Sequence, residues 1–138
     1  MTIQQISVFL ENKSGRLAEV TKTLGDAGVN MRAATIADTA DFGILRIVVD
    51  NPHKALDALD KKGFTAKVTD VFAIELEDRP GGLAEIMELF HKTGVNIEYL
   101  YSSLENKNNK AVVIFKVDDT EHGNKIFREH KLTAIKNF

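Results

Sequence analysis

Two stretches of the chain match each other and decide the fold: Glu11–Met31, which reads ENKSGRLAEVTKTLGDAGVNM, and Glu77–Ile97, which reads EDRPGGLAEIMELFHKTGVNI. Eight of their 21 positions are identical at a constant offset of 66 residues, where average residue usage gives about one match by chance. The shared residues fall in two separate blocks, a glycine loop with Leu-Ala-Glu and a later Gly-Val-Asn. We therefore interpret the 138-residue chain as a tandem duplication.

The later part of each copy aligns at a slightly larger offset. Ile44–Asp50 (ILRIVVD) resembles Val112–Asp118 (VVIFKVD) at an offset of 68, so two extra residues fit in the polar loop Glu105–Lys110. No stretch rich in Gly, Pro or Ser separates the copies, as a flexible linker would require. We expect two abutted modules, residues 1–69 and 70–138, that form one body.

The hydrophobic pattern predicts the same order of elements in each copy. Strands are expected at Ile3–Leu10, Val29–Ala37, Ile44–Val49 and Phe64–Val68, and again at Val71–Leu76, Asn96–Ser103, Ala111–Val117 and Thr133–Lys136. Amphipathic helices are expected at Leu17–Ala27, from the cap Asn51 to Gly63, at Leu83–Thr93 and at Glu121–His130. The order βαββαβ therefore occurs twice, which is the split βαβ motif. We predict an α+β fold of two tandem ferredoxin-like units, each an antiparallel four-stranded sheet with both helices on one face.

Composition limits the classes of function. With 18 Lys+Arg against 20 Asp+Glu the formal charge is −2, so no strong positive field recruits nucleic acid or an acidic membrane. The absence of cysteine excludes disulfides, thiolate catalysis and Cys-ligated zinc. No apolar run approaches the roughly 20 residues of a membrane span, and the start of the chain does not resemble a signal peptide. We expect a cytoplasmic protein that binds neither nucleic acid nor membrane.

The repeated residues concentrate in the turns before and after the first helix of each copy. The first turn presents a helix N-terminus, whose unpaired amides and partial positive charge attract anions. Glycine there leaves room for a ligand carboxylate, and asparagine offers both a donor and an acceptor. The candidate ligand-binding residues are Asn12, Gly15, Asn30, Asp78, Gly81, Gly82 and Asn96. This constellation suits a small zwitterion such as a free amino acid.

Structural interpretations of the same residues stay open. Gly15 and Gly81 also fit a tight turn, and Asn30 and Asn96 also fit local hydrogen bonds to the backbone.

The remaining aromatic and histidine side chains point to no further site. In a regular strand Tyr99 and Tyr101 share one face with Ile97, where they either line a pocket or pack between sheets. The histidines show no spacing typical of a metal site, and we expect neither metal nor cofactor: they are His53, His91, His122 and His130.

These motifs resemble ACT domains, small regulatory modules that bind amino acids. The resemblance is carried by ENKSGRLAEV…GVNM and EDRPGGLAEI…GVNI and covers nearly the whole chain as two modules. It implies a βαββαβ fold whose modules associate side by side. It also implies an amino acid bound at the interface between modules, by the loop before the first helix and the start of the second strand. The positions that match this site are Asn12, Gly15 and Asn30 in the first module and Asp78, Gly81 and Asn96 in the second.

The resemblance also implies partners. Most family modules are fused to an enzyme that they regulate, and no catalytic domain accompanies these two. We therefore expect a free-standing, non-catalytic regulatory protein that binds an amino acid, acts on a metabolic enzyme and forms a homo-oligomer, namely a dimer. Some serine-binding members have a polar residue two positions before the loop asparagine, where this chain has Leu10 and Leu76. Arg16 aligns with Gly82, so the two sites are not chemically equivalent.

Other classes with this topology need different residues. Acylphosphatases hold phosphate with an arginine in a glycine loop, and the surroundings of Arg16 and Arg79 do not resemble that loop. RNA-recognition modules need aromatic residues on the central strands, where GILRIVVD and AVVIFKVD offer only Phe115. The remaining alternative is a structural interaction module without a retained ligand site.

Overall fold

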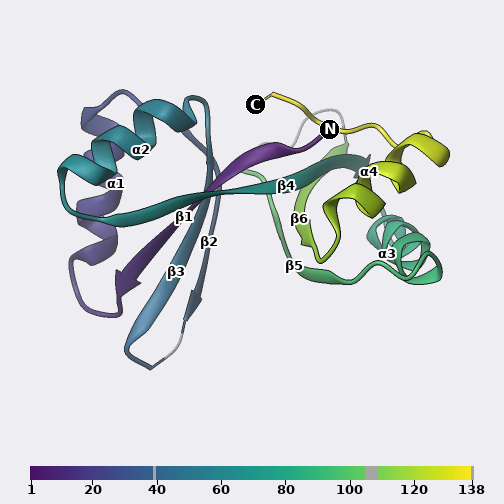
Figure 1. The fold of residues 1–138 in the computed structure, drawn as a ribbon, viewed down its shortest axis with the longest axis horizontal. Helices are drawn as coiled ribbons and strands as arrows, with labels where there is room; N and C mark the ends of the chain where they lie inside the picture. The colour runs from purple at the N-terminus through teal and green to yellow at the C-terminus, as the bar shows by residue number, and fades with distance from the viewer. Residues whose placement is uncertain (39, 105–108, 138) are drawn as a thin grey trace. The chain divides into compact units, whose positions relative to one another are not determined.

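The computed structural model describes residues 1–38, 40–104 and 109–137. Their contacts divide into an N-terminal unit, residues 4–69, and a C-terminal unit of residues 1–3 and 70–137. The elements of the first half are β1 (Ile3–Glu11), α1 (Arg16–Asp26), β2 (Met31–Asp38), β3 (Phe42–Val49) and α2 (Pro52–Lys61). After β4 (Thr65–Glu77), which contributes to both units, follow α3 (Gly82–Lys92), β5 (Ile97–Ser102), β6 (Lys110–Val117) and α4 (Thr120–Glu129) (Figure 1).

Both units have the predicted α+β architecture. The strand order is β2-β3-β1-β4 in the N-terminal unit and β4-β6-β5 in the C-terminal unit. The pairs β1–β3, β2–β3, β4–β6 and β5–β6 are all antiparallel. In each unit both helices cover the same face of the sheet, as Figure 1 shows. Within the described residues, no helix is both long and apolar enough to cross a membrane.

The structure joins two strands that the sequence pattern separates. The strands expected at Phe64–Val68 and Val71–Leu76 form one strand, β4, of 13 residues. Thr69 and Asp70 connect them and include neither glycine nor proline, so nothing in the backbone interrupts the extended conformation. β4 thereby carries the chain from one unit into the other.

The last expected strand is reduced to a single bridge. Of Thr133–Lys136, only Ala134 forms a β-bridge, with Ile74. The next residue, Ile135, donates its N–H to the carbonyl of Ala73 over 2.8 Å. The fourth strand position of the C-terminal unit is therefore occupied, but not by a regular ladder.

A β-bulge changes the direction of the tyrosines in β5. The register of β5 against β6 shifts between Ile97 and Tyr99, and an extra residue of this kind interrupts the alternation of side chains. Ile97 packs on the core, whereas Tyr99 and Tyr101 lie on the opposite face. The expectation that all three share one face is therefore wrong. The N-terminal unit has the same irregularity between Met31 and Ala33.

The two cores use equivalent positions with different side chains. Four phenylalanines form the centre of the C-terminal core: Phe72, Phe90, Phe115 and Phe127. Their contacting rings have centroids 4.8–6.3 Å apart. The N-terminal unit has aliphatic residues at the equivalent positions: Ile6, Leu24, Ile47 and Leu59. All of these side chains are at most 1% exposed, so the duplication preserved the core positions while their volumes changed.

A glycine makes room for the aromatic core. A Cβ atom at Gly123 would lie 2.6 Å from Cε2 of Phe72 and 3.2 Å from Cγ2 of Val117. The equivalent residue of the N-terminal unit is Ala55, which is fully buried among aliphatic side chains. The C-terminal core therefore combines a larger side chain, Phe72, with a smaller residue, Gly123, as the close packing of a core requires.

Two glycine-to-alanine variants test this compensation. We expect Gly123→Ala to lower the free energy of unfolding by about 1–3 kcal/mol, because the added methyl group overpacks the core. Gly25→Ala is the control, since Gly25 lies exposed in α1 and nothing would lie within 4 Å of its Cβ. Alanine there should raise stability by about 0.5–1 kcal/mol. Chemical denaturation measures both, and a Gly123→Ala variant as stable as the unmodified chain would contradict the compensation.

Candidate functional site

The loops that precede α1 and α3 share one backbone conformation. Gly15 and Gly81 have φ angles of +89° and +85°, and each immediately precedes its helix. This left-handed region favours glycine, so the tight-turn interpretation holds at both positions. Nothing would lie within 4 Å of a Cβ at Gly15, and at Gly81 only Nη1 of Arg79 would, at 4.0 Å. The space beside both glycines is therefore open as well.

Gly82 is a glycine for a different reason. It is buried at the start of α3, and a Cβ atom there would lie 2.5 Å from the carbonyl oxygen of Glu77. The missing side chain lets α3 pack directly against the end of β4. A side chain at position 82 would therefore meet protein atoms and not open space.

Asn12 and Asp78 connect their loops to the neighbouring strand hairpin. The N–H of Asn12 donates to the carbonyl of Asp41 over 2.8 Å, and the N–H of Asp78 donates to Asn109 over 2.9 Å. The side-chain amide of Asn12 also donates to the carbonyl of Ala40 over 3.3 Å. These bonds hold both loops in the same position relative to their own hairpins.

Asn30 and Asn96 bond an aspartate at the end of the adjacent strand. The N–H of Asn30 donates to Oδ1 of Asp50 over 3.0 Å, and the N–H of Asp50 donates back to the carbonyl of Asn30 over 3.1 Å. Asn96 and Asp118 make the same two bonds, each of 3.1 Å. Both bonds use the asparagine backbone, while the side chains are exposed. Local hydrogen bonding therefore explains the backbone of each asparagine but not its exposed side-chain amide.

The structure keeps Asn12 and Gly15 in one loop but separates both from Asn30. Gly15 precedes α1 and Asn30 follows it, and α1 has 11 residues. Since a helix rises about 1.5 Å per residue, its two ends lie about 16 Å apart. Gly81 and Asn96 are separated in the same way by the 11 residues of α3. One amino acid can contact both features only where the loop of one module meets the strand start of another.

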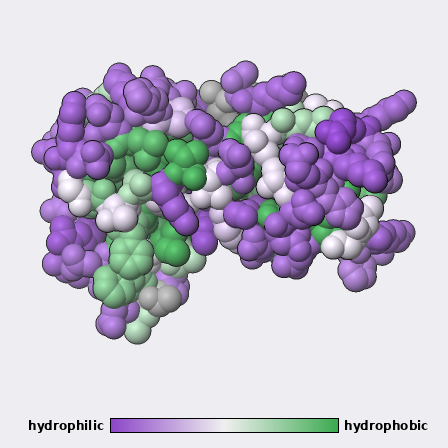
Figure 2. Space-filling model, in the orientation of Figure 1, coloured by the Kyte–Doolittle hydropathy of each residue, from purple (hydrophilic) through white to green (hydrophobic). Residues whose placement is uncertain are grey.

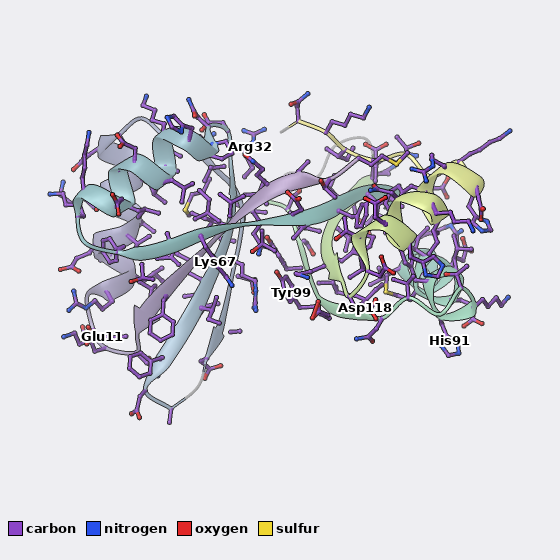
Figure 3. All side chains as sticks on the ribbon, viewed as in Figure 1. Glu11, Arg32, Lys67, His91, Tyr99 and Asp118 are labelled. Carbon is purple, nitrogen blue, oxygen red and sulfur yellow. The ribbon has the colours of Figure 1, made fainter. Side chains whose placement is uncertain are left out.

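An arginine bridges two glutamates at the start of α1. Nη1 of Arg16 lies 2.8 Å from Oε2 of Glu19, and Nη2 lies 3.4 Å from Oε1 of Glu11. Lys13 also pairs with Glu11, over 3.2 Å. Figure 3 shows Glu11 at the end of β1. The helix start that was expected to attract anions therefore carries both carboxylates and cations.

The C-terminal unit builds the equivalent bridge from another position. Arg79 contacts Glu77 through Nε over 3.1 Å and Glu85 through Nη2 over 2.8 Å. Hydrogen bonds from Glu85 and Glu77 raise the pKa of Arg79 above its ordinary value. Because Gly82 stands where the first unit has Arg16, the guanidinium comes from the loop instead of the helix.

A groove of about 710 Å³ lies in the N-terminal unit, and the motifs of the sequence did not predict it. It runs along the end of β1, one side of α1 and the start of β4, and none of the candidate residues named from the sequence lines it. Its aromatic lining residues are Phe9, Phe42 and Phe64. The difference between the two copies could have indicated the groove, because the second module has charged or aliphatic residues at the positions of these three phenylalanines. Among the residues that the structure describes, no cluster of His, Asp or Glu is suited to a metal ion.

Comparison with known proteins bears on the whole chain. A model of the family described as the ACT domain pair matches residues 1–138. This match confirms the resemblance that the two glycine loops and the two Gly-Val-Asn turns carry.

Three known proteins illustrate the range of relatives. The crystal structure of protein BT0572 from Bacteroides thetaiotaomicron is 41% identical, has a TM-score of 0.91, and is aligned over 98% of this chain and 92% of that one. The ligand-free regulatory subunit of aspartate kinase from Thermus thermophilus shares the fold, with a TM-score of 0.67 at 19% identity over 91% of this chain and 87% of that one. The acetolactate synthase small subunit of Buchnera aphidicola subsp. Baizongia pistaciae is 32% identical over 85 residues, 59% of this chain. The match spans about half of that curated relative, 52% of its length.

The loop glycines allow a test that separates backbone conformation from packing. We expect Gly15→Ala to lower the free energy of unfolding by about 1–2 kcal/mol, because a left-handed φ of +89° disfavours any Cβ. Gly15→Asn should lose less, since asparagine tolerates this region better. Equilibrium denaturation without ligand measures both. An unchanged stability in Gly15→Ala would mean that the loop relaxes to another conformation.

Proposed function

The chain belongs to the ACT domain pair family, and on this basis we propose that it is a non-catalytic regulatory protein that binds a free amino acid. The observation that carries the proposal is the repeated pair of features at the two ends of α1 and of α3. One end has an open glycine loop, and the other has an exposed asparagine. The bonds of Asn30 and Asn96 to their aspartates come from the backbone, which any residue except proline could supply, yet both copies have asparagine.

The proposed site forms where the glycine loop of one module meets the strand start of another. First-turn amides of a helix have no intrahelical acceptor and bind a carboxylate. The exposed amide of Asn30 or Asn96 supplies an acceptor for the ligand's ammonium group and a donor for its carboxylate. Asn12 and Asp78 lie in the glycine loops and complete the polar surroundings. In this proposal the modules are residues 1–69 and 70–138.

The relatives support a metabolic enzyme as the partner. One relative is the small subunit of acetolactate synthase, and a protein of the same fold is the regulatory subunit of aspartate kinase. We propose that this chain passes an amino-acid signal to an enzyme in the cytoplasm. A homodimer would supply a second set of loops and strand starts, and native mass spectrometry measures both the oligomer and any retained ligand.

Substitution of the asparagines tests the proposal. We expect Asn30→Ala and Asn96→Ala each to weaken amino-acid binding by roughly 1–3 kcal/mol, because a charged ligand group loses its partner. The melting temperature without ligand should change little, since the bonds to Asp50 and Asp118 come from the backbone. A ligand at a hundredfold excess over its dissociation constant raises stability by about 2.7 kcal/mol, so thermal denaturation detects both effects.

Asp50→Ala removes a bonded carboxylate and should lower the melting temperature of the ligand-free chain, unlike Asn30→Ala. If none of the twenty common amino acids at millimolar concentration changes the melting temperature, the structural-module alternative replaces amino-acid regulation.

A further inference from the structure

The N-terminal unit carries an exposed aromatic pair that its duplicate lacks. Phe9 and Phe42 stack with ring centroids 4.9 Å apart, although they are 49% and 42% exposed. At the equivalent positions the C-terminal unit has Glu75 and Lys110. Because the same topology forms with a charged pair, the fold does not require the phenylalanines. Exposed apolar surface that the fold does not require is a candidate for a binding surface.

The aromatic pair forms one wall of the 710 Å³ groove, to which Phe64 adds further apolar surface. Figure 2 shows hydrophobic surface over this part of the N-terminal unit. Volumes of about 300–1,000 Å³ are typical of small-molecule sites. The groove therefore has the size of a ligand site and an apolar wall that only one of the two units possesses.

Another part of the lining comes from α1, which covers the other face of the sheet from the aromatic pair, and it carries an incompletely bonded arginine. Arg16 is held at 2.8 Å by Glu19 but only at 3.4 Å by Glu11. Nε of Arg16 is buried and has no hydrogen-bond acceptor among the described residues. Nε and Nη2 form one edge of the guanidinium, which binds a carboxylate in a bidentate manner. A ligand carboxylate that replaces the long contact to Glu11 would satisfy both nitrogens.

The charged and aromatic walls meet at one residue. Glu11 lies opposite Phe42 in the ladder between β1 and β3, on the face where Phe9 stacks on Phe42. A Glu11 carboxylate released from Arg16 would be placed between the guanidinium and the rings. It could accept a hydrogen bond from a ligand ammonium group while the rings contact the ligand side chain.

We propose that this groove is a second ligand site, present only in the N-terminal module, for a zwitterionic amino acid with an aromatic or large aliphatic side chain. The carboxylate binds Arg16, the ammonium group binds Glu11 and Glu19, and the side chain contacts Phe9 and Phe42. The charges of the groove lining are balanced, with Glu11, Glu19 and Asp26 against Arg16, Lys22 and Lys62. A ligand that carries both charges keeps this pairing balanced.

The groove adjoins the glycine loop of the proposed function, because Glu11 and Arg16 flank it, but it uses side chains that the proposed function does not use. Neither Asn12 nor Gly15 lines the groove, and Asn30 lies beyond the far end of α1. Asn30 therefore distinguishes the two sites, because it belongs to the proposed function alone.

Calorimetric titration of the full chain with L-phenylalanine tests the ligand class. We expect saturable binding that includes one site per chain in the groove. L-Aspartate, 3-phenylpropionate and phenethylamine lack the apolar side chain, the ammonium group and the carboxylate, respectively, and should bind there at least tenfold more weakly. No binding of L-phenylalanine, or equal binding of 3-phenylpropionate, would overturn the proposal.

The sequence of the C-terminal unit supplies a matched variant of the groove. Phe9→Glu with Phe42→Lys places the residues of the C-terminal unit in the groove and should weaken L-phenylalanine binding at least tenfold. Gly25→Ala, on α1 but outside the groove lining, should leave the L-phenylalanine affinity unchanged. Arg16→Gln, which keeps the aromatic pair, should also weaken binding at least tenfold if the double variant does not fold.

Two outcomes would assign the aromatic pair elsewhere. If Asn30→Ala abolishes all L-phenylalanine binding while the double variant retains it, the ligand occupies the asparagine site alone. If the double variant retains full L-phenylalanine affinity but changes the oligomeric state in analytical ultracentrifugation, the aromatic pair is a contact between copies of the chain. Either result overturns the groove site.

Discussion

The left-handed glycine before the first helix of each unit is the constraint on which the rest of the structure depends. The positive φ of Gly15 and Gly81 turns the chain from a strand into a helix that packs back onto the same sheet. That packing buries the apolar side of the helix and closes the core. It also brings the glutamate that ends the strand next to the glutamate in the first helical turn, where one guanidinium can bridge both. Fold and site chemistry therefore begin at the same residue.

The duplication separates what the fold requires from what it merely permits. Four central core positions are the same in both units, yet they hold aliphatic side chains in one and phenylalanines in the other, with Gly123 as the compensating small residue. The glutamate–arginine–glutamate bridge occurs in both units from different arginines. The stacked pair Phe9–Phe42 occurs in one unit only. Features that recur in both units with different residues belong to the architecture. An exposed apolar feature that one unit has and the other lacks is a candidate for a specific function.

The geometry also explains why one module alone would be an incomplete site for the amino acid that we propose as ligand. A helix of 11 residues separates the loop that can bind a carboxylate from the asparagine that can bind an ammonium group. Tandem duplication and oligomerisation are two ways to supply the missing half, and both copies have kept both halves. The groove of the N-terminal unit, in contrast, has its charged and aromatic walls within one unit.

The sequence by itself determined the duplication, the element order and most helix boundaries, because these follow from local periodicity and local turn chemistry. The cap at Asn51 is an example: its side chain accepts a hydrogen bond from the N–H of Lys54 over 3.1 Å, as the Asn-Pro pair predicts. Only the tertiary structure decided that β4 is continuous, that a bulge reverses Tyr99, and that a groove forms from Phe9, Phe42 and Phe64. Each of these depends on how segments far apart in the sequence pair and pack, and no local pattern encodes that register.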